Sequence, residues 1–370
     1  MSLRPARLPL PLPLLVQVLR APALMASLDP AGWDWLLRQA LAANLTASLY
    51  CLAEEAGLLE ALPARPRRHL LWAAALLRRH GAGVRWEVAR IGAALAPLGL
   101  PLILLKGAAY AAAGLAPSRG RLFSDIDILV PRAALPEVES ALMKAGWISQ
   151  HQDAYDQRYY RQWMHEIPPM QHAQRASMID VHHAILPLTA RAHPDPDQLR
   201  AAAVPVAGFG RARVHTLGPA DMVLHSATHL FYDGEFDKGL RDLLDLHRLL
   251  LQFGTTPGWW EALPARAAAL ELSRPLFYAL RYCVRIFGTP VPAATVAALE
   301  DAAPGTALLA LMDALFGRAL LPRHASCADR FSGVAHSLLY IRGNWLRMPP
   351  PLLARHLLHK AFISPAAAPE

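Results

Sequence analysis

The residues best suited to chemistry lie between positions 106 and 182 of the chain. They combine carboxylates, cations, a glycine and a hydroxyl: Lys106, Gly107, Arg119, Arg121, Ser124, Asp125, Asp127 and Asp180. Asp125 and Asp127 fall in the alternating segment DIDILV, which predicts a β-strand over 125–130. Side chains two residues apart in a strand point to the same side, roughly 6.5–7 Å apart. Two carboxylates on an otherwise apolar strand repel each other, and a divalent cation removes that repulsion.

A third carboxylate completes the predicted metal site. Asp180 lies in the alternating segment 178–182, which also predicts a strand. If the two strands are neighbours, Asp125, Asp127 and Asp180 converge at one edge of a sheet. Three carboxylates can hold two divalent ions about 3.5–4 Å apart, an arrangement suited to in-line displacement at phosphorus. We therefore expect two Mg²⁺ ions, with Mn²⁺ as an alternative, and we expect Asp180 to orient the attacking hydroxyl and help to remove its proton.

Phosphate binding is expected next to this metal site. Gly107 lies between an apolar segment, 101–106, and an Ala-rich segment, 108–113, so it is predicted at a strand-to-helix junction. Because glycine has no Cβ, phosphate oxygens can approach the backbone N–H groups at the positive end of the helix. Lys106, Arg121 and Ser124 are expected to help hold a triphosphate, with Arg119 as a further contact.

Three more residues are candidates for lining the site, and each has an ordinary structural alternative. His182 shares the side of the strand that carries Asp180, while His229 and Asp242 lie on predicted helices. His225 and His229 share a helix face but lack the intervening glutamate of zinc hydrolases, so packing is the simpler interpretation. Asp242 and Asp245 can form salt bridges with neighbouring arginines. Asp-x-Asp alone also suits a solvated edge strand, so the metal-site prediction depends on the combination of motifs.

Composition limits the class of protein. With 370 residues, 54% hydrophobic and 18% charged, the chain can bury a large core, which excludes a wholly disordered protein. The net charge of +8 comes mostly from arginine, which binds phosphate well, although a background rich in Ala, Arg and Pro explains the excess equally well. Cys51, Cys283 and Cys327 are far apart, so we expect no disulfide and a cytoplasmic location. Prolines and Arg20 interrupt the apolar stretch 8–19 before it reaches membrane-spanning length, so no membrane span is expected.

The order of segments predicts an α+β fold rich in helix. We expect a Pro-rich lead-in over 1–30, a helical region over 31–98, a mixed-sheet core over 99–190, and a helical region over 191–370 with a short hairpin near 204–214. Within the core, 158–167 is compatible with a strand. The helices expected in the last region cover 221–231, 238–252, 261–287, 293–316 and 352–362.

The segment LLKGAAYAAAGLAPSRGRLFSDIDILV resembles the nucleotidyltransferase superfamily that includes polymerase beta, most closely its bacterial branch of uncharacterised nucleotidyltransferases. The likeness covers most of the chain and includes a D-V-H strand at 180–182, the pair His225/His229 and a Leu-rich helix at 241–250. The resemblance implies a nucleotidyltransferase-type core and Mg²⁺-dependent transfer of a nucleoside monophosphate from an NTP to an acceptor. Many members carry Gly-Ser or Gly-Gly where this chain has Gly107-Ala108, and Ala108 offers the phosphates no hydroxyl, which puts the donor in question.

The acceptor divides the functional hypotheses. We favour a hydroxyl or phosphate of a small molecule or peptide, and the alternatives are a tRNA- or protein-modifying enzyme similar to nucleotidyltransferase toxins, or a non-catalytic nucleotide-binding scaffold. Five residues near the C-terminus can bind RNA phosphate or serve helix packing, and we favour packing: Arg342, Trp345, Arg347, Arg355 and Lys360. RNA is therefore a partner that the sequence allows but does not favour.

Overall fold

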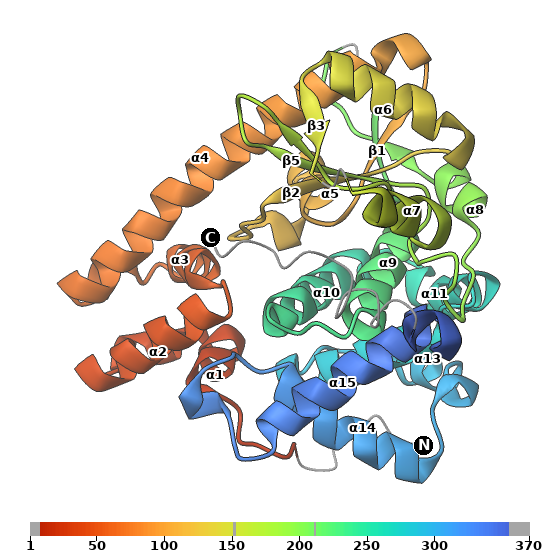
Figure 1. Cartoon of the computed structure of the whole chain (residues 1–370). Coiled ribbons are helices and arrows are strands. Elements are labelled where there is room, and N and C mark those ends of the chain that lie inside the picture. The colour runs from red at the N-terminus through yellow and green to blue at the C-terminus, as the bar shows by residue number, and fades with distance from the viewer. Residues whose placement is uncertain (1–7, 151–152, 211, 355–370) are drawn as a thin grey trace.

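The computed structural model describes residues 8–150, 153–210 and 212–354, and its centre is a mixed β-sheet (Figure 1). In the described part the sheet has seven strands in the order β3-β4-β5-β2-β1-β7-β6. The strands are β1 Leu102–Leu104, β2 Asp125–Leu129, β3 Trp147–Ser149, β4 Met170–His172, β5 Met178–His182, β6 Val204–Pro205 and β7 Val214–Thr216. The α+β class predicted from the sequence is confirmed. The hairpin β6–β7 matches the one predicted near 204–214, and because it joins the sheet, the sheet extends beyond residues 99–190.

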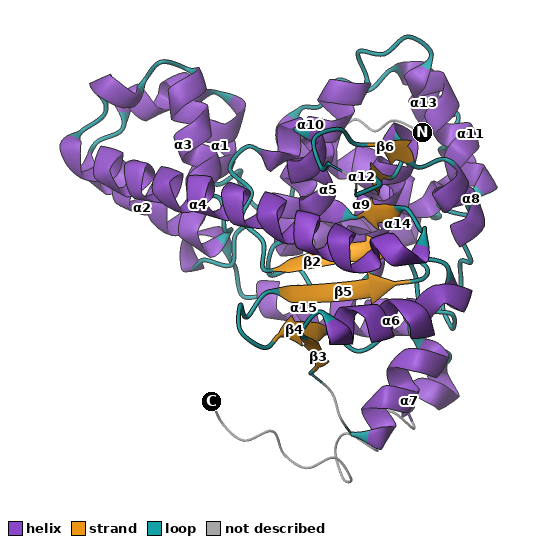
Figure 2. Ribbon diagram, turned by 90° about the horizontal axis from the view of Figure 1, so that it is seen from above, coloured by secondary structure: helices purple, strands orange, loops and turns teal. Residues whose placement is uncertain are grey.

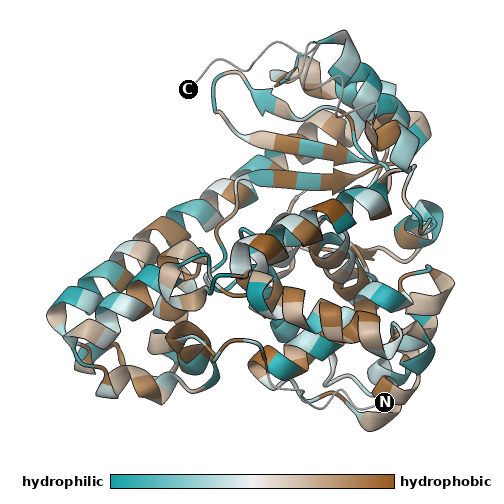
Figure 3. Cartoon of the chain, turned by 60° about the horizontal axis from the view of Figure 1, so that its bottom comes forward, coloured by the Kyte–Doolittle hydropathy of each residue, from teal (hydrophilic) through white to brown (hydrophobic). Residues whose placement is uncertain are grey.

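The register between β2 and β5 positions the acidic residues. The two strands are parallel, and Asp127 lies opposite Asp180 while Leu129 lies opposite His182. Strand β1 is antiparallel to β2, so its end lies beside the start of β2, where the N–H of Leu105 donates to the carbonyl of Asp127. Figure 3 shows hydrophobic and hydrophilic residues alternating along the longest strands. This alternation puts the apolar residues on one face and the carboxylates on the other.

Helices cover both faces of the sheet. The N-terminal helices are α1 Leu14–Arg20, α2 Pro30–Ala42, α3 Thr46–Glu55 and α4 Ala64–Leu95. Those between the strands are α5 Lys106–Ala113, α6 Leu135–Lys144, α7 Ala154–Trp163 and α8 Pro196–Ala201. The C-terminal helices are α9 Pro219–Tyr232, α10 Gly239–Phe253, α11 Trp259–Ala269, α12 Ser273–Tyr282, α13 Ala293–Ala297, α14 Thr306–Ala319 and α15 Ser332–Arg347. Helices α4 and α6 lie over one face (Figure 2), and α9 and α10 lie on the other side (Figure 1).

The N-terminal segment is more structured than a lead-in. Helix α1 falls inside the region predicted to be only Pro-rich, and its Leu15, Val16 and Val18 are fully buried. The helical region expected over 31–98 contains several helices, and Asn44 adopts a left-handed backbone conformation between α2 and α3. Helix α1 therefore contributes to the core although it directly follows the Pro-rich stretch that ends at Pro13.

Several other element boundaries differ from the expectation. Residues 158–167, which are compatible with a strand by sequence, form most of α7 and the turn after it. The long helix expected over 261–287 is broken at Glu271, which has a positive φ, and the one over 293–316 is broken before Gly305. Helix α15 was not predicted, and the helix predicted over 352–362 lies largely outside the described residues.

The cysteines and the apolar helices of the described residues bear on the expectations of no disulfide and no membrane span. Cys51, Cys283 and Cys327 are free thiols, and all three are buried. Among the helices of the described part, none is long and apolar enough to cross a bilayer.

Gly120 lies where the loop before β2 contacts α3, and substitution of this residue tests that contact. It has a positive φ of 80°, its carbonyl accepts a hydrogen bond from the Ser48 hydroxyl, and a Cβ there would collide with the Ser48 backbone. Gly57 has a similar φ of 67° but open space around it. We expect Gly57→Ala to lower the free energy of unfolding by about 1–2 kcal/mol through backbone strain alone. Gly120→Ala should cost about 1–3 kcal/mol more through the collision, and equal losses in urea unfolding would contradict the contact.

Candidate active site

The carboxylates of Asp125, Asp127 and Asp180 meet on one face of the sheet. One oxygen from each lies within 4.8 Å of the others. Asp125 and Asp127 share a side of β2 because they are two residues apart, and Asp180 is the register partner of Asp127 on β5. The convergence predicted from the alternating segments is therefore present in the structure. Three carboxylates at this separation need positive charge between them or around them.

A lysine and a histidine keep Asp127 ionised. Its burial disfavours the charged form, but Lys106 and His182 outweigh that cost and hold the pKa of Asp127 far below its usual range. The Lys106 Nζ lies 3.4 Å from Asp127 Oδ1, and the His182 Nε2 lies 2.9 Å from the same oxygen. Asp127 Oδ1 is thus fixed from two directions, which orients the carboxylate.

Asp180 has less compensation, because His182 only partly offsets the effects that raise its pKa. Burial, followed by the nearby charges of Asp127 and Glu166, raises the pKa of Asp180 to about 7. Its Oδ1 is buried and has no hydrogen-bond partner in the part of the chain that the structure describes. A buried carboxylate oxygen without a donor, next to two further carboxylates, fits a hard divalent cation such as Mg²⁺. The residues present therefore suit the predicted metal, with Asp125, Asp127 and Asp180 as its ligands.

The junction between β1 and α5 brings a lysine to the carboxylates. Lys106 is the first residue of α5 and adopts a positive φ of 44°, which is unusual for a residue with a side chain and typical of strain kept at functional sites. Burial lowers the pKa of Lys106, but Asp127 and Glu166 outweigh this and the pKa is raised, so its ammonium stays charged. Gly107 has a local reason to be glycine, because a Cβ would lie 2.7 Å from the ring of Phe123.

A pocket of about 310 Å³ opens beside these residues, between the sheet and the loop that joins α9 to α10. Its lining is strongly polar and comprises Lys106, Gly107, Arg121, Phe123, Asp125, Asp127, His229, Asp233, Glu235, Asp237, Lys238, Arg241 and Asp242. Carboxylates outnumber the side-chain cations in this lining, so a polyanionic ligand would need metal ions to enter it. The acidic loop 233–237 and Lys238 carry no recognisable motif, and the sequence did not indicate them.

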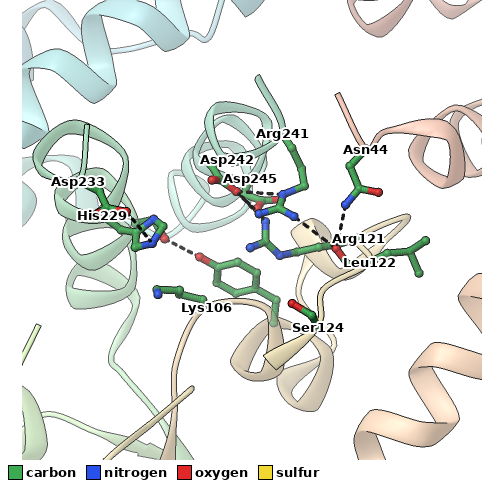
Figure 4. A network of polar contacts seen from close by, with 12 residues as sticks. Asn44, Lys106, Arg121, Leu122, Ser124, His229, Asp233, Arg241, Asp242 and Asp245 are labelled. Atoms are coloured by element: carbon green, nitrogen blue, oxygen red, sulfur yellow. Dashed lines mark hydrogen bonds and ion pairs between the residues drawn. The ribbon is translucent and has the colours of Figure 1, made fainter. Parts of the chain in front are cut away.

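Arg121 belongs to a buried ion network that joins the loop before β2 to α10 (Figure 4). Its guanidinium pairs with Asp245 and lies 3.3 Å from Asp242 Oδ1. Arg241 also pairs with Asp242, at 2.7 Å, and donates to the carbonyl of Leu122 at 3.4 Å. The network fixes the segment that leads into Asp125, so Arg121 positions the site, and its predicted contact with phosphate stays a prediction.

The other predicted residues lie at different distances from the pocket. His229 and Asp242 are part of its lining, whereas Ser124 lines a neighbouring groove along α4 and has its Oγ 3.4 Å from Asp125 Oδ1. The Arg119 side chain is 66% exposed and pairs with Glu55 of α3. His225 is buried one turn below His229, and burial holds its pKa well below the usual value.

His182 lies between Asp127 and Glu166, and Glu166 was not among the residues predicted from the sequence. Its Nε2 bonds to Asp127, and its Nδ1 lies 3.3 Å from Glu166 Oε2. Burial lowers the pKa of His182, but Glu166 and Asp127 outweigh it, so the pKa is raised. Burial also raises the pKa of Glu166. Glu166 is placed by an isolated bridge opposite His182, and no pattern in the sequence marks that pairing.

Carboxylates converging beside a lysine at the start of a helix define a class of site that can hold divalent cations and phosphates. The sequence matches the family model described as uncharacterised nucleotidyltransferase over residues 29–288, well over half of the chain. The chain therefore belongs to this family of nucleotidyltransferases. A comparison with curated proteins gives no match.

The raised pKa of Asp180 predicts a pH-dependent stability in the absence of metal. An unfolded aspartate has a pKa of about 3.9, so between pH 4 and 7 the folded state binds more protons than the unfolded state. The contribution of Asp180 to the stability of the metal-free protein should therefore fall as the pH rises from 5 to 7.5, whereas buried histidines such as His225, whose pKa is lowered, act in the opposite direction. Relative to the wild type, Asp180→Asn should therefore become more stable over this range, and Mg²⁺ should reduce the difference. Thermal unfolding of both proteins across this range tests the prediction, and parallel curves would contradict it.

Arg121 and Arg119 form a matched pair for testing the ion network. Removing Arg121 leaves the buried carboxylates of Asp242 and Asp245 without this partner, which typically costs about 3–5 kcal/mol. Arg119→Met removes an exposed pair and should change the free energy of unfolding by no more than about 0.5 kcal/mol. Urea unfolding of Arg121→Met and Arg119→Met measures the difference, and similar small losses would show that the network is not needed for folding.

Proposed function

We propose that this protein transfers a nucleoside monophosphate from an NTP to a hydroxyl or phosphate of an acceptor, using two Mg²⁺ or Mn²⁺ ions held by Asp125, Asp127 and Asp180. The observation that carries the proposal is the convergence of these carboxylates, with an unpartnered oxygen on Asp180, beside a polar pocket. Membership of the nucleotidyltransferase family supports the reaction class.

In the proposed reaction an acceptor oxygen attacks the α-phosphorus while the bond from that phosphorus to pyrophosphate breaks. Bound metal ions would supply charge neutralisation and alignment of the reacting oxygens. Asp180, as a ligand of the ion that would bind the attacking hydroxyl, is suited to orient that hydroxyl and to help remove its proton. Its raised pKa belongs to the metal-free site and would fall when the ions bind. Lys106 carries a charged ammonium at the pocket, where it can contact the departing phosphates, and Gly107 leaves its backbone close to them.

A small molecule or peptide is the favoured acceptor. The pocket lining carries the carboxylates Asp233, Glu235 and Asp237, which would repel the backbone of a nucleic acid. Among the C-terminal basic residues, Arg342 donates to the carbonyl of Phe231, and Arg347 pairs with Asp233. These contacts favour packing over RNA binding.

Trp345 also has a packing contact within the chain, because the guanidinium of Arg191 lies over its ring, 4.7 Å from the ring centroid. Arg355 and Lys360 lie outside the described residues. An RNA- or protein-modifying activity is the second candidate, and it is favoured only by the arginine-rich composition. Salt-sensitive RNA binding would support it.

A non-catalytic scaffold is the remaining alternative, and calorimetry separates it from an enzyme. Titration of each NTP with Mg²⁺ into the full chain should give heat of binding for at least one nucleotide. Because Ala108 provides no hydroxyl, we expect the affinity to depend strongly on the metal. Binding without any transfer to a panel of acceptors would favour the scaffold, and the absence of heat for every nucleotide would contradict the proposed donor.

Substitution of the carboxylates tests the reaction itself. Asp125→Asn and Asp127→Asn remove charge at the metal site, where metal ions contribute several kcal/mol, so transfer of label from α-³²P-NTP should fall at least about 100-fold. Glu137→Gln, on the exposed face of α6, is the matched control and should leave labelling unchanged. Labelling that persists in both aspartate variants would contradict the proposal, provided that circular dichroism shows them folded.

A further inference from the structure

A second group of side chains that could bind a metal contacts the acidic trio, the name we give to Asp125, Asp127 and Asp180. It consists of His165, Glu166 and His182, and one ligand atom from each lies within 4.8 Å of the others. The proposed transfer reaction uses none of these residues as a ligand or a base. Their chemistry also differs from that of the trio, since two of the three potential ligands are imidazole nitrogens.

Backbone hydrogen bonds hold this group in place. Glu166 and His182 lie opposite each other in an antiparallel bridge, so their side chains share a face. On either side of that bridge, the N–H of Ile167 donates to the carbonyl of Val181 at 3.1 Å, and the N–H of His183 donates to the carbonyl of His165 at 2.8 Å. The potential ligands thus come from β5 and from the segment 165–167 that is hydrogen-bonded to it, as a preorganised site requires.

The polar atoms of the group are incompletely satisfied. His182 Nε2 lies 2.9 Å from Asp127 Oδ1, which leaves Nδ1 toward Glu166 Oε2, at 3.3 Å. That separation exceeds the roughly 2.7–2.9 Å of a charged hydrogen bond. It is close to the roughly 3.4 Å between two ligands that are each about 2.1 Å from a tetrahedral ion. His165 Nδ1 is buried and has no hydrogen-bond partner among the described residues.

We infer that His165, Glu166 and His182 bind a transition-metal ion of the borderline class, Zn²⁺ above all, at a site separate from the acidic trio. Two imidazoles and one carboxylate are a set that zinc takes in proteins, with a fourth position left for water, whereas Mg²⁺ prefers oxygen. Glu166 is 17% exposed, which gives an ion access from solvent.

The arrangement assigns this ion a structural purpose. Asp127 would accept a hydrogen bond from the outer nitrogen of a metal-bound His182, the usual way in which a carboxylate orients a metal-ligating histidine. The ion would join the segment 165–167 to β5 and, through His182, would hold Asp127 in the orientation that the trio needs. This inference goes beyond the proposed function, because metal binding here does not require nucleotidyl transfer.

Cobalt titration tests the site. The full chain is stripped with a chelator, returned to buffer with excess Mg²⁺ to occupy the trio, and titrated with Co²⁺ while visible absorption is recorded. We expect the bands of a four-coordinate Co²⁺ ion at about one ion per chain, and we expect Zn²⁺ to displace them. His165→Ala and Glu166→Gln should weaken Co²⁺ binding at least about 100-fold, because losing a ligand costs no less than losing an outer-shell partner.

Two controls separate this site from the reaction. His193→Ala removes an exposed histidine and should bind Co²⁺ like the wild type. Asp125→Asn should lose labelling by NTP yet keep Mg²⁺-resistant Co²⁺ binding. Wild-type protein without Mg²⁺-resistant Co²⁺ binding would overturn the inference, as would binding that survives in Glu166→Gln or disappears in Asp125→Asn. Glu166→Gln preserves the size of the side chain, so it decides the question if His165→Ala does not fold.

Discussion

Electrostatic repulsion among carboxylates on adjacent parallel strands is the constraint on which the rest of this structure depends. The register that opposes Asp127 to Asp180 also brings Asp125 and Glu166 into the same neighbourhood, and few cations compensate them. Lys106 and the hydrogen bond from His182 stabilise the charged form of Asp127, whereas Asp180 keeps a raised pKa and an oxygen without a hydrogen-bond partner among the described residues. A fold that keeps such a cluster gains from it only when cations bind.

Parts of the chain distant in sequence hold this cluster in place. Arg121 and Arg241 tie the loop before β2 to α10, and Ser48 ties the same loop to α3. Helix α15 packs against the loop after α9 so closely that a Cβ at Gly343 would lie 2.7 Å from the carbonyl oxygen of Asp233. The pocket itself is lined by α5, the loop before β2, β2 and the segment from α9 to α10, and the family match over 29–288 includes all of these elements.

The sequence predicted those features that depend on local periodicity. The alternation around Asp125 and Asp180 identified two strands and the faces of their carboxylates, and the Lys106–Gly107 junction identified the start of α5. The pairing of β2 with β5 is long-range, so the sequence could predict that the three carboxylates meet only on the assumption that these strands are neighbours. Glu166 was not found because its segment has no clear alternation and its partner His182 is distant in the chain.

Tertiary contacts give some residues a role that their type and position in the sequence do not reveal. Arg121 was predicted to bind phosphate, which stays a prediction, but its ion pairs with α10 depend on a helix packing that the sequence does not show. Helix α15 was missed because Gly333 and Gly343 lower its intrinsic helix propensity, and close packing against the loop at Asp233 accounts for Gly343. The glycine at 107 was correctly placed at a strand-to-helix junction, although the ring of Phe123 already requires it.

Anomalous X-ray diffraction from crystals of the full chain grown with Mn²⁺ and a non-hydrolysable NTP tests the central claim most directly. The account predicts Mn²⁺ peaks among the carboxylates of Asp125, Asp127 and Asp180, with the triphosphate extending toward Lys106. A structure in which nucleotide and Mn²⁺ bind elsewhere, while these three carboxylates hold no ion, would contradict it.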